Sequence, residues 1–385
     1  MKKIIKYIDK PLFIVTVLLF IIGLIMVFSA SNVTAYMTYA VSPYNYFFKQ
    51  GGFLLAGFLL FLIMIHFNTK SYGFFSWGLL LLGIASLVLL LIMGKAKNHA
   101  MSWFDLGPIS LQPSEFIKII TIVFLAYYYD NFTKKEKSWT KSLFPIGVCL
   151  VVAFLIFIQP DLGTTIIYCA IVGIIFLAVP ISNEIKYKIV FSAVGLLAIA
   201  GVAIISGKGV LKERQFERFD FRNPCEKILS TGNQVCNCYI AINNGGLFGV
   251  GIGNSTQKYL YLPESYTDFI FPVIIEELGL ITGILIIFLY AIIIYRIVMI
   301  AKKCYNLSQG LICYGVAAYI LVHVVVNLVG VLGLLPLTGV PLPFLSYGGS
   351  YALCLTISLT IVQRINAETE IIKQEEKLKN KIREI

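Results

Sequence analysis

Three groups of polar residues stand at the ends of apolar segments, where side chains of this kind can do chemistry. The first holds Glu115 and Lys118, which lie three residues apart and therefore on one face of a helix. A charged side chain at the centre of a membrane helix costs about 2.5–3.5 kcal/mol, so such groups are expected to face a cavity and to pair with one another. Asp268, buried beside a lysine, would be tuned as a general base.

The first group runs from Trp103 to Lys118. Pro113 suits the first turn of a helix, and it places Glu115 close to the helix N-terminus. Two plainer interpretations stay open. Glu115 and Lys118 could form a structural ion pair without a part in turnover, and Trp103 could be an aromatic residue of the membrane interface.

The second group closes the long polar segment 207–268 and continues into the next apolar run. Thr267 and Asp268 open that run, and Glu276 and Glu277 follow about two helical turns later, where no solvated helix face accounts for them. An aspartate at a helix start is often only a cap, and this interpretation also stays open.

The third group covers residues 330–350. Pro336, Pro341 and Pro343, together with several glycines, prevent a continuous helix. A non-helical backbone at membrane depth is tolerated only where it lines a cavity or is covered by protein. The segment therefore predicts either a shaped pocket or an outer loop that caps the bundle.

Several common catalytic signatures are absent from the sequence. It contains no phosphate-binding GxxxxGK[ST], no GxSxG, no HExxH and no cysteine cluster of zinc spacing, which argues against ATP-driven chemistry. Three cysteines share the long polar segment, so a disulfide from Cys225 to either Cys236 or Cys238 is expected in an oxidising compartment, with three free thiols as the alternative.

The elements that position these groups are membrane helices. The chain is 58% hydrophobic and 13% charged, against about 25% charged residues in soluble domains. We predict an all-α polytopic membrane protein of about ten spans. The spans are 11–30, 52–67, 73–93, 113–130, 143–158, 162–180, 187–206, 269–298, 308–334 and 346–363. The domain boundary is placed after residue 366, and 367–385 is expected to form a charged tail.

The distribution of Lys and Arg predicts the orientation. Basic residues concentrate in alternate short loops and in the tail, which puts both termini in the cytoplasm and the long loop between helices 7 and 8 outside. The net charge of +11 is explained by this pattern, so no nucleic-acid partner is expected. Two outer loops, 94–112 and 207–268, are also basic, which suits an anionic headgroup or a pyrophosphate, unless long loops simply cross regardless of charge.

Several long motifs, in order, resemble the SEDS family of shape, elongation, division and sporulation proteins. From Asp9 to Arg364 the shared motifs are GLIMVFSAS, LQPSEF, QPDLGT, the block GGLFGVGIGNSTQKYLYLPESYTDFIF, EELG and LPLTGVPLPFLSYGGS. The Gln257–Lys258 pair and the following YLPE resemble the FtsW branch more than the RodA branch. Cys236 to Cys238 and the approach to Trp103 depart from the family pattern.

The resemblance implies a peptidoglycan glycosyltransferase that polymerises lipid II at the outer face of the bacterial cytoplasmic membrane during septal synthesis. Asp268 stands at the family's essential aspartate and is expected to be the base, its carboxylate held by Lys118 with Glu115 nearby. The resemblance implies substrate contacts at Trp103, Gln112, Ser114, Lys258, Glu264, Thr267, Ser346, Gly348 and Gly349.

The resemblance also bears on cofactors and partners. A divalent cation, Mg²⁺ or Mn²⁺, is one way to offset the pyrophosphate charge, besides outer-face Lys and Arg. The implied partners are lipid II, the growing glycan strand, a class B penicillin-binding protein transpeptidase and the division or elongation machinery. An elongation polymerase of the RodA type, a lipid II flippase and a scaffold that recruits the transpeptidase are the alternatives.

Overall fold

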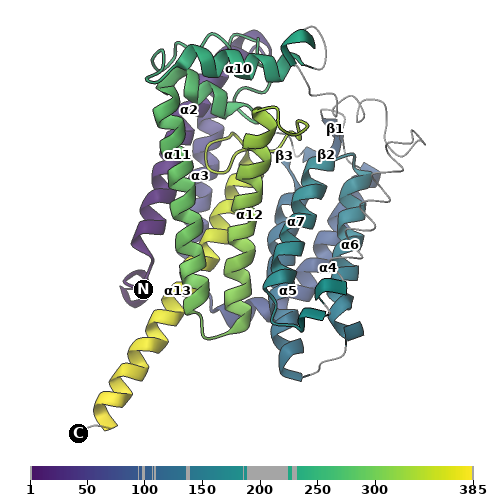
Figure 1. Cartoon of the computed structure of the whole chain (residues 1–385), viewed down its shortest axis with the longest axis vertical. Coiled ribbons are helices and arrows are strands. Elements are labelled where there is room, and N and C mark those ends of the chain that lie inside the picture. The colour runs from purple at the N-terminus through teal and green to yellow at the C-terminus, as the bar shows by residue number, and fades with distance from the viewer. Residues whose placement is uncertain are drawn as a thin grey trace.

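A computed structural model shows a bundle of long helices with a small β-sheet and a short helix at one end (Figure 1). It describes residues 2–93, 95–97, 100–105, 107, 110–135, 139–184, 186–188, 224–227 and 232–383. The helices are α1 (Lys2–Ile5), α2 (Lys10–Met37), α3 (Asn45–Met64), α4 (Thr69–Met93), α5 (Pro113–Lys135), α6 (Trp139–Ile158), α7 (Leu162–Ala178), η1 (Pro224–Lys227), α10 (Asn233–Gly245), α11 (Ile270–Lys303), α12 (Leu307–Val331) and α13 (Gly349–Arg383).

The predicted helical membrane fold is confirmed. Each predicted span falls on a helix except 187–206, which lies outside the described residues apart from its first two positions. In the described part, α2, α3, α4, α11 and α12 are long and apolar enough to cross a membrane, and shorter apolar helices cover Ser142–Ile158 and Leu162–Ala178. A tight turn at Gln159 and Pro160 separates α6 from α7.

The distribution of side chains is that of a protein dissolved in lipid. On the outside of the bundle, large apolar side chains such as Phe74 and Ile92 expose most of their surface. Charged side chains such as Lys118 and Glu277 are instead almost fully buried between helices. An apolar exterior of this extent marks a surface that lipid covers.

The predicted loop 94–112 contains a three-stranded antiparallel sheet. Strand β2 (Ala100–Asp105) pairs with β1 (Lys95–Lys97) on one side and with β3 (Ser110–Leu111) on the other. These strands are too short for a recognisable alternation of polar and apolar residues, which is why the sequence predicted only a loop.

Helix α11 is broken close to the two glutamates of the second group. Gly279 has φ 86° and ψ 165°, outside the helical region. A Cβ at this position would lie 2.2 Å from the Leu247 carbonyl oxygen, so the close approach requires glycine. The segment 246–251 lies beside the break and is hydrogen-bonded to it. The Val250 amide donates to the Glu276 carbonyl at 2.9 Å, and the Leu280 amide donates to the Gly246 carbonyl at 3.0 Å. The long loop is thereby tied to the membrane helix.

Both chain termini lie at the end of the bundle opposite α10 and the sheet (Figure 1). Asp9 caps α2 by accepting from the Leu12 amide, and it also forms an ion pair with Arg296 of α11. Helix α13 continues through the predicted boundary at residue 366, so the charged tail is an extension of the last membrane helix.

Candidate active site

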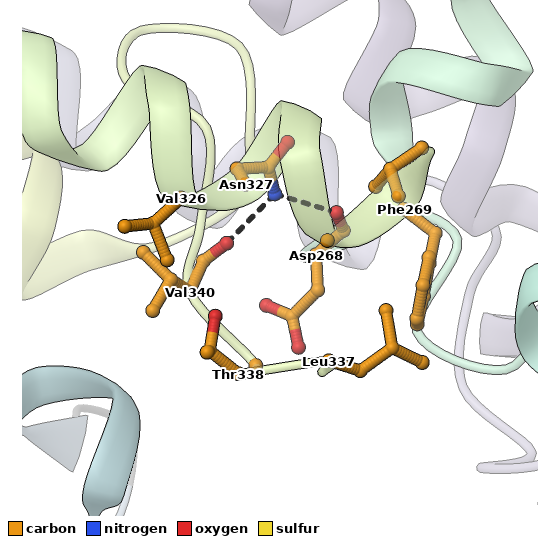
Figure 2. A pocket seen from close by; sticks show the side chains of 10 residues that line it. Asp268, Phe269, Val326, Asn327, Leu337, Thr338 and Val340 are labelled. Atoms are coloured by element: carbon orange, nitrogen blue, oxygen red, sulfur yellow. Dashed lines mark hydrogen bonds between the residues drawn. The ribbon is translucent and has the colours of Figure 1, made fainter. Parts of the chain in front are cut away.

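Asp268 lies in a small pocket where three segments meet (Figure 2). The pocket is lined by Asp268 and Phe269 just before α11, by the last turns of α12, and by residues 337–340. The last of these segments belongs to the Pro- and Gly-rich third group. A pocket wall was one of the two roles predicted for this segment, and residues 337–340 form such a wall.

The carboxylate of Asp268 lies directly over Gly339. A Cβ at Gly339 would stand 3.4 Å from Asp268 Oδ2, and Gly339 has φ +68°, a conformation that favours glycine. Glycine at this position therefore leaves room for the carboxylate and also supplies the turn that brings the loop beneath it.

The environment of Asp268 raises its pKa to about 7 from the ordinary value of 3.8. Burial contributes most, because it disfavours the charged carboxylate, and the negative charges of Glu264 and Asp161 add to the effect. A general base works best when its pKa is close to the operating pH. Asp268 meets this condition.

Asp161 belongs to the QPDLGT motif, but it was not predicted to lie near Asp268. It caps α7 by accepting from the Thr164 amide at 3.0 Å, and its other oxygen lies 3.5 Å from Gln112 Nε2. Gly163 packs the start of α7 against the Thr338 carbonyl. The signal that could have found it is the Asp after Pro160, a helix cap that places a carboxylate at the same end of the bundle as Asp268.

Glu115 and Lys118 form a buried ion pair of 2.7 Å within α5. Lys118 Nζ also lies 3.0 Å from His323 Nε2, and the Tyr319 hydroxyl donates to Glu115 at 3.2 Å. His323 Nδ1 lies 2.7 Å from the Tyr319 carbonyl, so it carries the hydrogen there and Nε2 accepts from Lys118. Within the described residues, Lys118 thus pairs with Glu115 and His323, and the expected Lys118–Asp268 pair does not form.

Lys258 was expected to contact substrate, but in this structure its side chain is paired within the protein. The side chain is 1% exposed, and its ammonium donates to Glu277 at 2.9 Å, to the Gly253 carbonyl at 2.7 Å and to Ser29 Oγ at 3.3 Å. An ammonium has three hydrogens to donate, so all are used within the protein. Lys258 therefore ties the long loop to α2 and α11.

Glu276 organises the same loop from the other side. Its carboxylate accepts from the Thr256 amide at 3.2 Å, the Thr256 hydroxyl at 2.8 Å and the Gln257 amide at 3.3 Å, and it also bonds the Ser255 hydroxyl. The two glutamates that lacked a solvated-face explanation are thus structural anchors of the segment that leads to Asp268.

The other expected substrate contacts occupy three environments. Glu264 and Thr267 precede Asp268, and the Thr267 hydroxyl donates to Glu264 at 2.8 Å. The Ser346 hydroxyl donates to the Thr267 carbonyl at 2.6 Å. The remaining residues lie around the start of α5 and α13. The backbone amide of Gln112 donates to the Ser350 hydroxyl, and that of Gly348 donates to the Gln50 side chain. Gly349 packs on Phe53, Ser114 is buried, and Trp103 on β2 is half-buried.

A disulfide joins Cys225 of η1 to Cys236 of α10, and Cys238 is a buried free thiol. Cys225–Cys236 is one of the two pairings that were predicted, and Cys225–Cys238 does not form. The described residues contain no group of three His, Cys, Asp or Glu side chains that could hold a metal ion.

The fold and this pocket define a polytopic membrane protein with a buried carboxylate, that of Asp268, at one end of its helical bundle. Residues 9–371 match the family model of the FtsW, RodA and SpoVE proteins, which is described as "Cell cycle protein". The chain belongs to this family. The family resemblance predicted from the motifs is confirmed.

Two relatives come from Bacillus subtilis (strain 168). The chain is 37% identical to its probable peptidoglycan glycosyltransferase FtsW, with 95% of this chain and 92% of the relative covered. It is 34% identical to its stage V sporulation protein E, with 93% and 96% covered.

Solved structures share the fold. The rod shape determining protein RodA of Thermus thermophilus is 25% identical with a TM-score of 0.68, over 94% of this chain and 97% of RodA. A chain of a peptidoglycan synthase complex, whose structure concerns the coordination of polymerization and crosslinking, matches with a TM-score of 0.76 and 23% identity, over 94% of this chain and 98% of that one.

Proposed function

We propose that this protein is a peptidoglycan glycosyltransferase of the FtsW type, which polymerises lipid II into glycan strands during septal wall synthesis. The observation that carries the proposal is the Asp268 pocket, where a carboxylate with a pKa of about 7 stands at one end of a membrane bundle. Relatives that share more than nine tenths of their length with this chain bear the name of this activity, which supports the reaction class.

Asp268 acts as the general base. The 4-hydroxyl oxygen of the acceptor sugar attacks the anomeric carbon of the donor, and its proton passes to an Asp268 carboxylate oxygen. The bond between the anomeric carbon and the pyrophosphate oxygen breaks, and its electron pair leaves with the undecaprenyl pyrophosphate. Because this leaving group departs as a stable anion, the site needs no carboxylic acid to protonate it, unlike most glycosidases.

The pocket faces the outside of the cell, and both termini are cytoplasmic. The arrangement of the bundle supports this orientation, because both termini lie opposite the sheet and α10 (Figure 1). Basic residues at the ends of helices on the terminal side, such as Lys302 and Lys303, agree with the positive-inside rule. Lipid II reaches such a pocket from the outer leaflet.

A class B penicillin-binding protein is the partner. The proposal is supported by the likeness in fold to a chain of a complex that coordinates polymerization with crosslinking. The partner's transpeptidase would crosslink strands that this protein releases on the same side of the membrane.

Strand formation from purified lipid II tests the proposal. We expect the purified protein, with its cognate transpeptidase, to form glycan polymer, and expect Asp268→Asn to abolish polymer without loss of folded protein. Glu375→Gln, in the exposed tail, is the matched control and should be as active as the native chain. Lipid II crossing proteoliposome membranes without any polymer would favour a flippase instead.

A further inference from the structure

Asn327 joins the segment that carries Asp268 to the opposite wall of the pocket. Its side-chain Nδ2 donates one hydrogen bond to the Asp268 carbonyl and one to the Val340 carbonyl, both at 2.8 Å (Figure 2). A primary amide has two hydrogens, so both are used. Asn327 is 4% exposed, and α12 holds its backbone rigid.

The orientation of this amide is fixed by what it faces. Two carbonyl oxygens stand on one side of Asn327, and only the nitrogen can donate to them. The amide oxygen points away from both in Figure 2, and within the described structure it is buried without a hydrogen-bond partner. Leaving a buried acceptor unpaired is unfavourable, so the bonds to the two carbonyls must outweigh it.

Ser346 supplies a second bond next to the first. Its hydroxyl donates to the Thr267 carbonyl at 2.6 Å and accepts from the Leu342 amide at 2.8 Å. Successive carbonyls, those of Thr267 and Asp268, are therefore each held by a side chain. The flanking residue Phe269 caps α11 without a side-chain hydrogen bond, so no capping side chain adds to these two anchors.

These bonds determine where the base points. The backbone on either side of the Asp268 Cα is anchored, and the second anchor of Asn327, Val340, is the neighbour of Gly339, over which the carboxylate lies. The amide therefore connects the base and the wall that faces it through two hydrogen bonds.

We infer that Asn327 is the positioning residue for Asp268, and that it sets the direction of the base by clamping the Asp268 and Val340 carbonyls together. This inference rests on the proposed glycosyltransferase activity. Asn327 acts through Asp268 and does not itself take the proton. Ser346, expected to contact substrate, shares this supporting role.

Two substitutions separate positioning from substrate contact. Asn327→Leu keeps the approximate size but removes both donors, and Asn327→Asp replaces the donor by a carboxylate. Asn366→Asp is the matched control, because Asn366 also donates to a backbone carbonyl, that of Tyr7 at 2.8 Å, but at the other end of the bundle.

Steady-state polymerisation of lipid II gives the first readout. A misplacement of about 1 Å costs about 100-fold in rate, so we expect kcat of Asn327→Leu to fall by about that factor with KM for lipid II little changed, and Asn366→Asp to keep the native kcat. A native kcat for Asn327→Leu, or a raised KM with native kcat, would overturn the inference. Absence of polymer with the native chain would count against the proposed function instead.

A second readout needs no turnover. The infrared band of the protonated Asp268 carboxyl is measured as a function of pH in the native chain and in Asn327→Asp. In each case the spectrum of the same protein carrying Asp268→Asn is subtracted, so that only Asp268 contributes to the titration curve. Glu264 and Asp161 already face Asp268, and a further carboxylate at 327 should move the titration midpoint to higher pH. An unchanged midpoint in Asn327→Asp would show that residue 327 does not control the base.

Discussion

Replacing Lys258 with methionine tests whether this lysine supports the loop or binds substrate. The change removes the ammonium but keeps most of the apolar stem. Glu277, which is 1% exposed, then retains the Ser29 hydroxyl at 2.7 Å as its hydrogen-bond partner but has lost its counter-charge. Breaking a buried pair in this way costs about 3–5 kcal/mol. The Gly253 carbonyl also loses a donor, which adds about 1 kcal/mol.

The double substitution Lys258→Met with Glu277→Gln should recover most of that loss. A neutral glutamine removes the unpaired charge and still accepts from Ser29, so we expect the single variant to unfold at a clearly lower temperature than the double variant. Thermal unfolding in detergent measures this, with Lys302→Met at an exposed helix end as the control. The double variant should also regain polymerisation. If it folds as well as the native chain but remains inactive, Lys258 contacts substrate and the structural assignment is wrong.

Three further outcomes are expected. Gly339→Ala should lower the polymerisation rate, because the position has φ +68° and the new Cβ would meet Asp268 Oδ2, whereas Gly310→Ala, in an ordinary helix with its nearest neighbour at 3.5 Å, should not. Asp268→Asn should raise the unfolding temperature above pH 7, because the native carboxylate is then ionised and buried; the gain should shrink as pH falls through about 7 and vanish below 3.8. Reductant should lower the unfolding temperature of the native chain by removing a crosslink between residues 11 apart, worth about 3 kcal/mol, but should not affect the Cys225→Ser, Cys236→Ser double variant.

Hydropathy predicted the membrane helices well because lipid imposes one requirement on every span. A stretch of apolar residues long enough to cross must be helical, since its backbone has no other partner for its hydrogen bonds. The same physics does not act on β1 to β3 outside the bundle, and these short strands were not foreseen. The break at Gly279 was also missed, because it depends on the approach of Leu247 from a distant loop.

The candidate site was predicted in part. Asp268 and the Pro- and Gly-rich wall were found because a charge and a broken helix at membrane depth both demand an explanation. The pairing of Lys258 with Glu277 was not foreseen, since a lysine at the surface and a buried, paired lysine look alike until the fold shows the partner. Asn327 was not noticed, because an asparagine within an apolar helix acquires meaning only from the two carbonyls that it bridges.

The pH dependence of strand elongation tests the central claim most directly. The rate of strand elongation would be measured from about pH 5 to about pH 9, with saturating lipid II and with the native protein and its transpeptidase. Glu375→Gln is the control. If Asp268 is the base, kcat should rise with pH and level off above about 7, where its carboxylate is ionised. A rate that does not change through this range, or an Asp268→Asn variant that still elongates strands at the native rate, would contradict the account.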